Sequence, residues 1–190
     1  MLFMNTPYWQ SVEREMQTIP NFKPRGSGFR VYGINSIGKN DYRTAADRLL
    51  RRWDRPDITA RIMNRDIGMK FADMSHEIRF RKAIKDISYG RFKFMATIFL
   101  LSADEDLWNR SVGALDGSAV DFTKIRLRSI SIEGYTLYKA AKTIYTGAIE
   151  ITDEEIFDDK LVNDQLLHII FNGYIIAENG INVLNLEGKK

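Results

Sequence analysis

The 190-residue sequence contains no cysteine, only two histidines and four prolines, and no long apolar run. The absence of cysteine excludes disulfides, thiolate metal sites and a cysteine nucleophile, and it fits a reducing compartment. The densest apolar run, residues 94–101, is far shorter than the roughly 20 residues that a transmembrane helix needs. The N-terminus lacks the basic start and the small-residue cleavage site of a signal peptide. We therefore expect a cytoplasmic protein with no membrane partner.

The sequence offers only two histidines for metal binding or acid–base catalysis. His76 and His168 do not have the spacing that places two imidazoles on one metal ion. His76 follows Ser75, which we expect to cap a helix, so we expect His76 to be exposed. His168 lies among leucines and isoleucines and is expected to be a core or groove histidine. The sequence therefore predicts no catalytic residue and no cofactor.

An acidic run in the second half of the chain is the other candidate for metal chemistry. It lacks the glycine and the fixed alternation of a calcium-binding loop, and a helix start that favours negative charge explains it more simply. We therefore predict no metal site from its residues, which are Glu150, Asp153, Glu154, Glu155, Asp158 and Asp159.

The net charge of +3 conceals two halves of opposite charge. Residues 1–94 contain 19 Lys and Arg against 10 Asp and Glu, whereas residues 95–190 contain 9 against 15, so the halves carry +9 and −6. This asymmetry favours an anionic partner for the first half. A simpler interpretation is that the two halves attract each other, or that each charged surface is only solvated.

The apolar periodicity predicts a mainly α protein with minor β structure (α+β). We expect a basic, aromatic-containing N-terminal portion over residues 1–68, with a possible small hairpin near residues 29–38, and a helical domain with an acidic surface over residues 69–190. Extended segments are expected near residues 125–132 and 181–186. Helices are expected over residues 1–19, 40–53, 57–66, 75–89, 91–101, 103–108, 133–146 and 160–177, with another starting at Thr152.

Several details of these helices follow from the sequence. Residues 91–101 are expected to form a core helix, Gly147 to end the helix before it, and Thr152 with Glu155 to form a capping box. In the helix that Ser75 opens, we expect four apolar side chains to face inward, namely Ile78, Phe80, Ile84 and Ile87.

Arginine dominates the basic region. Residues 21–65 contain 11 Lys and Arg against 4 Asp and Glu, with aromatic residues such as Tyr42 and Trp53 interleaved. The guanidinium group makes bidentate contacts with phosphate or carboxylate and stacks on flat groups. No motif for reading specific bases accompanies it. The candidate contacts to nucleic acid or another anionic partner are Arg43, Arg48, Arg51, Arg52, Arg55, Arg61 and Arg65. The alternative is an arginine-coated helix on an ordinary surface.

Three segments carry a family resemblance: Phe71–Phe80 (FADMSHEIRF), Phe99–Asp104 (FLLSAD) and Leu137–Ala141 (LYKAA). In this order they resemble an uncharacterised domain family of Gram-positive bacteria and their mobile elements. The family has no established catalytic residues, so the resemblance implies none here. A small cysteine-free protein built on a mobile-element domain also resembles the anti-defence proteins that such elements encode, of which the anti-CRISPR inhibitors of Cas9 are an example. This second resemblance is one of genetic setting and not of residues.

We therefore expect a non-enzymatic binding protein, encoded by a phage or mobile element, that inhibits a host defence nuclease such as Cas9. Its partner would be that nuclease, its ribonucleoprotein, or RNA or DNA directly. Either the arginines hold an anionic surface, or the acidic second half mimics nucleic acid in a basic channel. The alternatives are a nucleic-acid-binding accessory protein and a metal-dependent nuclease that uses His76, Glu77 and the acidic run. The sequence leaves the oligomeric state open.

Overall fold

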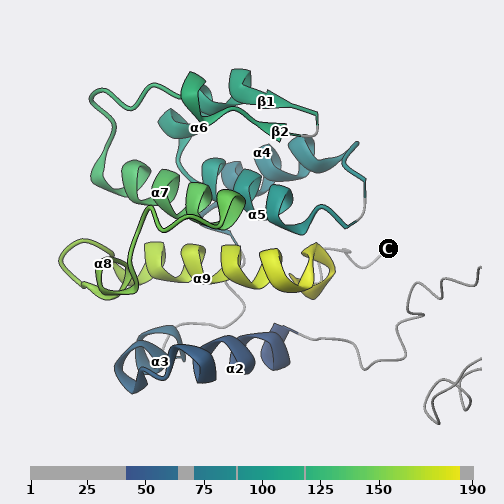
Figure 1. Cartoon of the computed structure of the whole chain (residues 1–190). Coiled ribbons are helices and arrows are strands. Elements are labelled where there is room, and N and C mark those ends of the chain that lie inside the picture. The colour runs from purple at the N-terminus through teal and green to yellow at the C-terminus, as the bar shows by residue number, and fades with distance from the viewer. Residues whose placement is uncertain (1–41, 64–70, 89, 118, 185–190) are drawn as a thin grey trace, which may run out of the picture. The chain divides into compact units, whose positions relative to one another are not determined.

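The computed structural model describes residues 42–63, 71–88, 90–117 and 119–184, which all belong to one compact unit, Lys39–Lys190. Its helices are α2 (Tyr42–Trp53), α3 (Pro56–Met63), α4 (Met74–Ile84), α5 (Phe92–Leu101), α6 (Glu105–Ser111), α7 (Ile132–Thr146), α8 (Asp153–Phe157) and α9 (Asp164–Asn179) (Figure 1). Strands β1 (Leu115–Asp116) and β2 (Ala119–Val120) form a small antiparallel hairpin. The expectation of a mainly α protein with minor β structure is confirmed.

Some of the expectations concern residues that the structure does not describe. The helix over residues 1–19, the hairpin near residues 29–38 and Arg65 lie outside the described residues. The boundary after residue 68 also lies there and stays a prediction.

Helix α5 is the centre of the fold. Every side chain from Phe94 to Leu101 is buried, as expected for a helix that is apolar on all sides, which confirms the predicted core helix. Helix α5 packs against both α7 and α9. A Cβ atom on Gly173 of α9 would lie 2.8 Å from Cδ2 of Leu100, so glycine allows the close approach of these two helices.

The helices of this unit form successive layers (Figure 1). Helices α2 and α3 pack on α9, and α9 packs on α5 and α7. On the other side, α4 packs on α5, and α6 packs on α5 and α7. Helices α2 and α4 therefore belong to different outer layers, separated by α9 and α5.

The ends of the later helices follow the sequence signals. Gly147 ends α7 in the left-handed conformation, with φ of 77°, as predicted. The capping box at the start of α8 is also confirmed, because Thr152 and Glu155 bond each other's backbone N–H groups. Asn163 caps α9 by accepting a hydrogen bond from the N–H of Leu166.

The start of α4 differs from the expectation. Asp73, not Ser75, is the N-cap, and its carboxylate accepts a hydrogen bond from the N–H of His76 at 2.6 Å. His76 is buried rather than exposed. The inward orientation predicted for Ile78 is also wrong, because residues two apart lie about 200° apart around a helix. Phe80 takes the buried side, so Ile78 faces solvent.

A similar shift occurs at α6. From the sequence this helix was expected to begin at residue 103, but Asp104 caps it, whereas Ser102 ends α5 and is buried. The side chain of Asp104 accepts from the N–H of Leu107 at 2.7 Å, as an N-cap does.

The expected extended segments are not strands over residues 125–132 and 181–184, and residues 185–186 lie outside the described residues. In the segment 125–130 the guanidinium of Arg110 donates to the carbonyls of Arg126 and Arg128, at 3.0 and 2.8 Å, which satisfies backbone groups that a neighbouring strand would otherwise bond. Residues Ile181–Leu184 form a 3₁₀ turn. The described hairpin lies instead at Leu115–Asp116 and Ala119–Val120, where no strand was expected.

Candidate nucleic-acid interface

Helix α2 carries most of the candidate arginines, and its apolar side fixes it to α9. Four apolar side chains of α2, those of Ala45, Ala46, Leu49 and Leu50, are buried. At the end of the helix the ring of Trp53 makes edge contacts with three aromatic rings, with centroid distances of 5.1, 5.4 and 6.0 Å to Phe157, Phe171 and Tyr174. The helix is therefore held in place over its whole length.

The start of α2 is fixed by a polar contact. The hydroxyl of Tyr42 donates to Oδ1 of Asn172 at 2.6 Å and lies 3.4 Å from Nε2 of His168. Burial raises the pKa of Tyr42 well above its usual range, so the phenol stays neutral and remains a donor. His168 and Asn172 are both buried, which confirms the expected core position of His168. Tyr42 and Trp53, expected as aromatic groups beside the arginines, thus pack on α9.

Two exposed arginines at the end of α2 have carboxylate partners. Arg52 pairs with Glu178 of α9 at 2.5 Å. Arg55 makes two hydrogen bonds to Asp57, at 2.9 and 2.7 Å, and its guanidinium lies 5.2 Å from the ring centroid of Phe157. The hydrogen bond from Arg55 lowers the pKa of Asp57 to about 2, so this pair stays ionised over the physiological range.

Arg61 of α3 is part of the fold. Its guanidinium donates to Asp164 at 2.8 Å and to the carbonyls of Phe157 and Val162 at 3.1 and 2.6 Å. Only 19% of its side chain is exposed. Arg61 and Arg52 each pair with a carboxylate of the acidic half. The two halves of the sequence therefore attract each other at these two ion pairs, as the simpler interpretation of their opposite charges expects.

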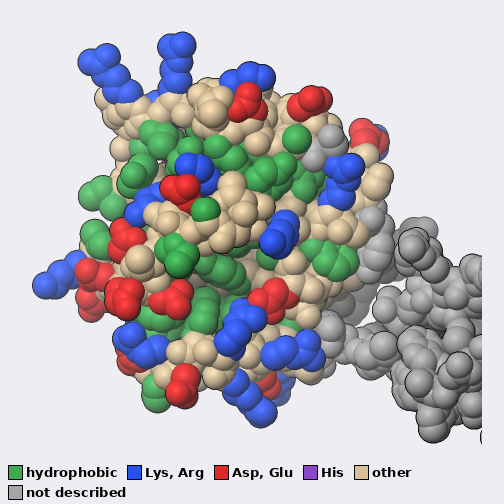
Figure 2. Space-filling model, viewed as in Figure 1, with side chains coloured by type: hydrophobic (Ala, Val, Ile, Leu, Met, Phe, Trp, Pro, Cys, Tyr) green, Lys and Arg blue, Asp and Glu red, His purple; other side chains and the backbone are tan. Residues whose placement is uncertain are grey.

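The remaining arginines, Arg43, Arg48 and Arg51, lie on the outer side of α2. All three are exposed, and among the described residues none of them forms an ion pair. Arg43 and Arg51 are two turns apart with Asp47 between them, and Arg48 precedes Arg51 by one turn. In Figure 2 basic side chains lie over α2 and α3, at the bottom of the view. These guanidinium groups are available to bind phosphate or carboxylate oxygens.

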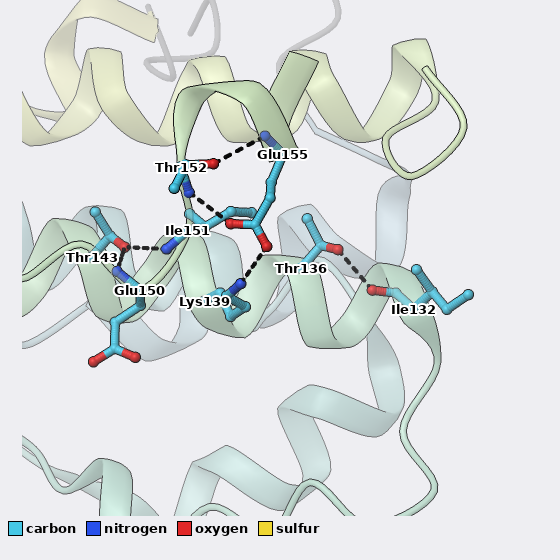
Figure 3. A network of polar contacts seen from close by, with 8 residues as sticks. All are labelled: Ile132, Thr136, Lys139, Thr143, Glu150, Ile151, Thr152 and Glu155. Atoms are coloured by element: carbon cyan, nitrogen blue, oxygen red, sulfur yellow. Dashed lines mark hydrogen bonds and ion pairs between the residues drawn. The ribbon is translucent and has the colours of Figure 1, made fainter. Parts of the chain in front are cut away.

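The acidic run is partly occupied by contacts within the fold (Figure 3). One oxygen of Glu155 accepts from Nζ of Lys139 at 2.7 Å, and the other accepts from the N–H of Thr152 at 2.8 Å. The bond from Lys139 is the main reason that the pKa of Glu155 is lowered. Glu150 pairs with Lys142 at 2.8 Å. These two carboxylates therefore join α7 to the segment that enters α8.

The other four carboxylates of the run face solvent, and acidic side chains gather over α8 at the left of Figure 2. They are Asp153, Glu154, Asp158 and Asp159. Across residues 42–63, 71–88, 90–117 and 119–184, no three His, Asp or Glu side chains come together in a group that could hold a metal ion.

His76 is enclosed by the core. Its Nδ1 accepts from the N–H of Ala72 at 3.0 Å, and its Nε2 lies 2.9 Å from the carbonyl oxygen of Phe99, to which it donates. Its ring lies within 5.1 and 4.6 Å of the ring centroids of Phe71 and Phe99. Burial lowers its pKa to about 4, so the imidazole is neutral at pH 7. Both nitrogens are used within the fold, and Glu77 beside it pairs with Arg81 instead.

No protein-family model matches this chain, and no curated protein or solved structure matches it either. In the part of the chain that the structure describes, no helix has the length and apolar character needed to cross a bilayer.

Proposed function

We propose that the protein is a non-enzymatic binding protein, encoded by a phage or mobile element, that holds the nucleic acid of a host defence nucleoprotein with the outer side of α2. The observation that carries this proposal is the set of three exposed arginines, Arg43, Arg48 and Arg51, which have no ion pair among the described residues. Their helix is fixed by its opposite side, so its backbone need not become ordered on binding. Guanidinium groups in such a row suit the phosphates of a strand.

The exposed arginines and the resemblance in setting support different parts of this proposal. The exposed arginines favour an anionic surface of any kind. The resemblance in setting to the small anti-defence proteins of mobile elements favours a host nuclease such as Cas9, with its guide RNA as the anionic surface, and a cytoplasmic site of action. An accessory protein that binds nucleic acid without inhibiting a nuclease would use the same arginines.

The second candidate function is mimicry of nucleic acid. Asp153, Glu154, Asp158 and Asp159 are exposed around α8, where they would face the basic channel of a nuclease. The metal-dependent nuclease ranks below both, because His76 is buried with both nitrogens bonded and Glu77 pairs with Arg81.

Reversal of charge distinguishes these functions. We expect R43E/R48E/R51E to weaken binding of a fluorescein-labelled 20-nucleotide RNA, and of a Cas9–guide RNA complex, by at least about 100-fold in fluorescence anisotropy, because several contacts to phosphate are replaced by repulsion. The matched control is K124E/R126E/R128E, which changes the net charge equally at three exposed residues before α7. This control is expected to change affinity less than about 5-fold.

Three results would contradict the proposal. Equal losses in the variant and the control would show that only the net charge matters. Loss of complex binding in D153N/E154Q/D158N/D159N, with R43E/R48E/R51E unaffected, would establish mimicry instead. Cleavage of the RNA by the purified protein, lost in a folded His76→Gln variant, would establish a nuclease.

A further inference from the structure

Helix α4 presents two large apolar side chains to solvent. Met74 is 71% exposed and Ile78 is 60% exposed, and they lie one turn apart on the same side of the helix. Burial of each would remove apolar surface from water, which is favourable in proportion to the area covered. This side of α4 is therefore better suited to a contact than to solvent alone.

The same side of α4 becomes basic toward its C-terminal end. Lys82 and Lys85 are exposed, and they lie about two and about three turns beyond Met74, so the stripe from Met74 to Lys85 is about 16 Å long. On its flank Arg81 pairs with Glu77 at 2.7 Å. We name the residues Met74, Ile78, Lys82 and Lys85 the α4 stripe.

The opposite side of α4 fixes the α4 stripe in place. His76 and Phe80 are buried, and His76 donates to the carbonyl of Phe99 in α5. Arg79 donates from Nε to the carbonyl oxygen of Ser102 at 2.9 Å. Because α4 is in a different layer from α2, a contact here is independent of the arginines Arg43, Arg48 and Arg51.

We propose that the α4 stripe binds an α-helix of a partner protein, antiparallel to α4, whose first turn is acidic and whose following turns are apolar. In this orientation the carboxylates of the first turn meet Lys82 and Lys85, while the later apolar residues cover Ile78 and Met74. Carboxylates are favoured at the N-terminus of a helix and lysines at the C-terminus, so both helix dipoles support this pairing. Antiparallel neighbouring helices also place their own dipoles favourably.

Other occupants use only part of the α4 stripe. Nucleic acid would pair its phosphates with Lys82 and Lys85 but would leave Met74 and Ile78 in water. An anionic bilayer would take up the apolar side chains, but exposed Asp73, which precedes Met74 at the start of α4, would be repelled by it. A partner helix can avoid both costs, since a basic residue in its last turn would lie near Asp73.

The test measures anisotropy of a labelled 15-residue helical peptide with glutamates in its first turn and leucines four residues apart in its next two turns. A scrambled peptide of the same composition is the reference. We expect Ile78→Asp to weaken binding by at least about 10-fold, because it places a carboxylate at the centre of the apolar contact. The matched control is Ile149→Asp, at a residue that is 80% exposed in the loop after α7, and it is expected to leave affinity unchanged.

Reversal of the basic end sharpens the test. K82E/K85E is expected to weaken the acidic peptide at least about 10-fold and to bind better a peptide in which lysines replace the glutamates. R43E/R48E/R51E is expected to bind the acidic peptide as the wild type does. Far-UV circular dichroism of each variant checks that the fold is kept.

The proposal is overturned if Ile78→Asp leaves the peptide affinity unchanged, or if the scrambled peptide binds equally well. It is also overturned if a 20-nucleotide RNA or phosphatidylserine vesicles bind the wild type through Lys82 and Lys85 while the peptide does not. Since the peptide assay does not depend on α2, its failure leaves the proposed function untouched, and failure of RNA binding at α2 leaves this proposal untouched.

Discussion

The arginines of α2 and α3 divide into two groups that differ in what they touch. Arg52, Arg55 and Arg61 each contact a carboxylate of the same molecule. The outer group, Arg43, Arg48 and Arg51, has no such contact among the described residues and faces solvent. Both groups come from one basic stretch with the same residue type and similar spacing. Spacing in the sequence therefore identifies a basic surface, whereas the fold decides which of its cations are already neutralised.

The first group is itself graded by burial. Arg61 is 19% exposed and makes three hydrogen bonds, two of them to backbone carbonyls, whereas the side chain of Arg52 is 55% exposed with one partner. A partly buried charged group that makes several hydrogen bonds contributes more to stability than an exposed ion pair. Loss of a paired arginine should therefore change mainly stability, whereas loss of an outer arginine should change mainly binding. Four measurements test this separation, from the largest expected effect to the smallest.

Phe99→Ala is expected to cause the largest loss in the free energy of unfolding among these variants. Phe99 is fully buried and contacts the rings of Phe71, Phe80 and His76. Its removal should lower the free energy of unfolding by about 3–5 kcal/mol, measured by urea denaturation. A loss below about 1 kcal/mol would show that α5 is not the core helix.

Arg61→Ala is expected to lower the free energy of unfolding by about 2–3 kcal/mol. Two buried-side carbonyls, of Phe157 and Val162, and the carboxylate of Asp164 lose their donor. RNA affinity at α2 should stay within about 3-fold of the wild type. A stable variant with weakened RNA binding would move Arg61 into the outer group.

A pH titration extends the comparison to a histidine. The pKa of His76 is about 4 in the folded protein, below the value near 6.5 of an unfolded chain. The unfolded state therefore binds more protons between these values, so stability is complete above pH 6.5 and is lost as the pH falls toward 4. We expect His76 to account for a loss of about 2 kcal/mol between pH 7 and pH 5.

The control for this titration is His76→Gln, which keeps a donor for the carbonyl of Phe99 but cannot titrate. It should be less stable than the wild type at pH 7 and should lack the contribution of His76 to the pH dependence. The same loss between pH 7 and pH 5 in both proteins would contradict the buried, neutral imidazole.

Arg52→Ala should have the smallest effect. Exposed ion pairs contribute about 0–1 kcal/mol, so the free energy of unfolding should fall by less than about 1 kcal/mol in thermal or urea denaturation. Glu178→Gln, which removes the charge of its partner, should have a similarly small effect. A loss above about 2 kcal/mol in either variant would place this pair with Arg61.

Helical segments with strong signals could be predicted from the sequence. The apolar stripe of α2, the fully apolar α5, Gly147 and the capping box at Thr152 depend on residues within a few positions of each other. The wrong predictions of secondary structure arise where a contact with a residue distant in the sequence determines the local conformation. The guanidinium of Arg110 occupies carbonyls of the segment 125–130, so alternation there does not produce a strand.

The candidate interface shows the same limit. The sequence identifies the basic stretch, but Glu178 and Asp164, which neutralise Arg52 and Arg61, lie more than 100 residues further along the chain. No local pattern reveals such a pairing. The exposure of Ile78 could have been predicted, since a helical wheel that places Phe80 inside must place Ile78 outside.

The outer arginines, and not the paired ones, are proposed to contact phosphate. The direct measurement is the salt dependence of RNA binding from about 50 to 300 mM KCl. Each phosphate contact to a single strand contributes about 0.7 to the slope of log affinity against log salt concentration. We predict that R43A/R48A/R51A reduces this slope by about 2, while R52A/R55A leaves it unchanged. An unchanged slope in R43A/R48A/R51A, with the reduction in R52A/R55A, would show that the paired arginines contact phosphate instead.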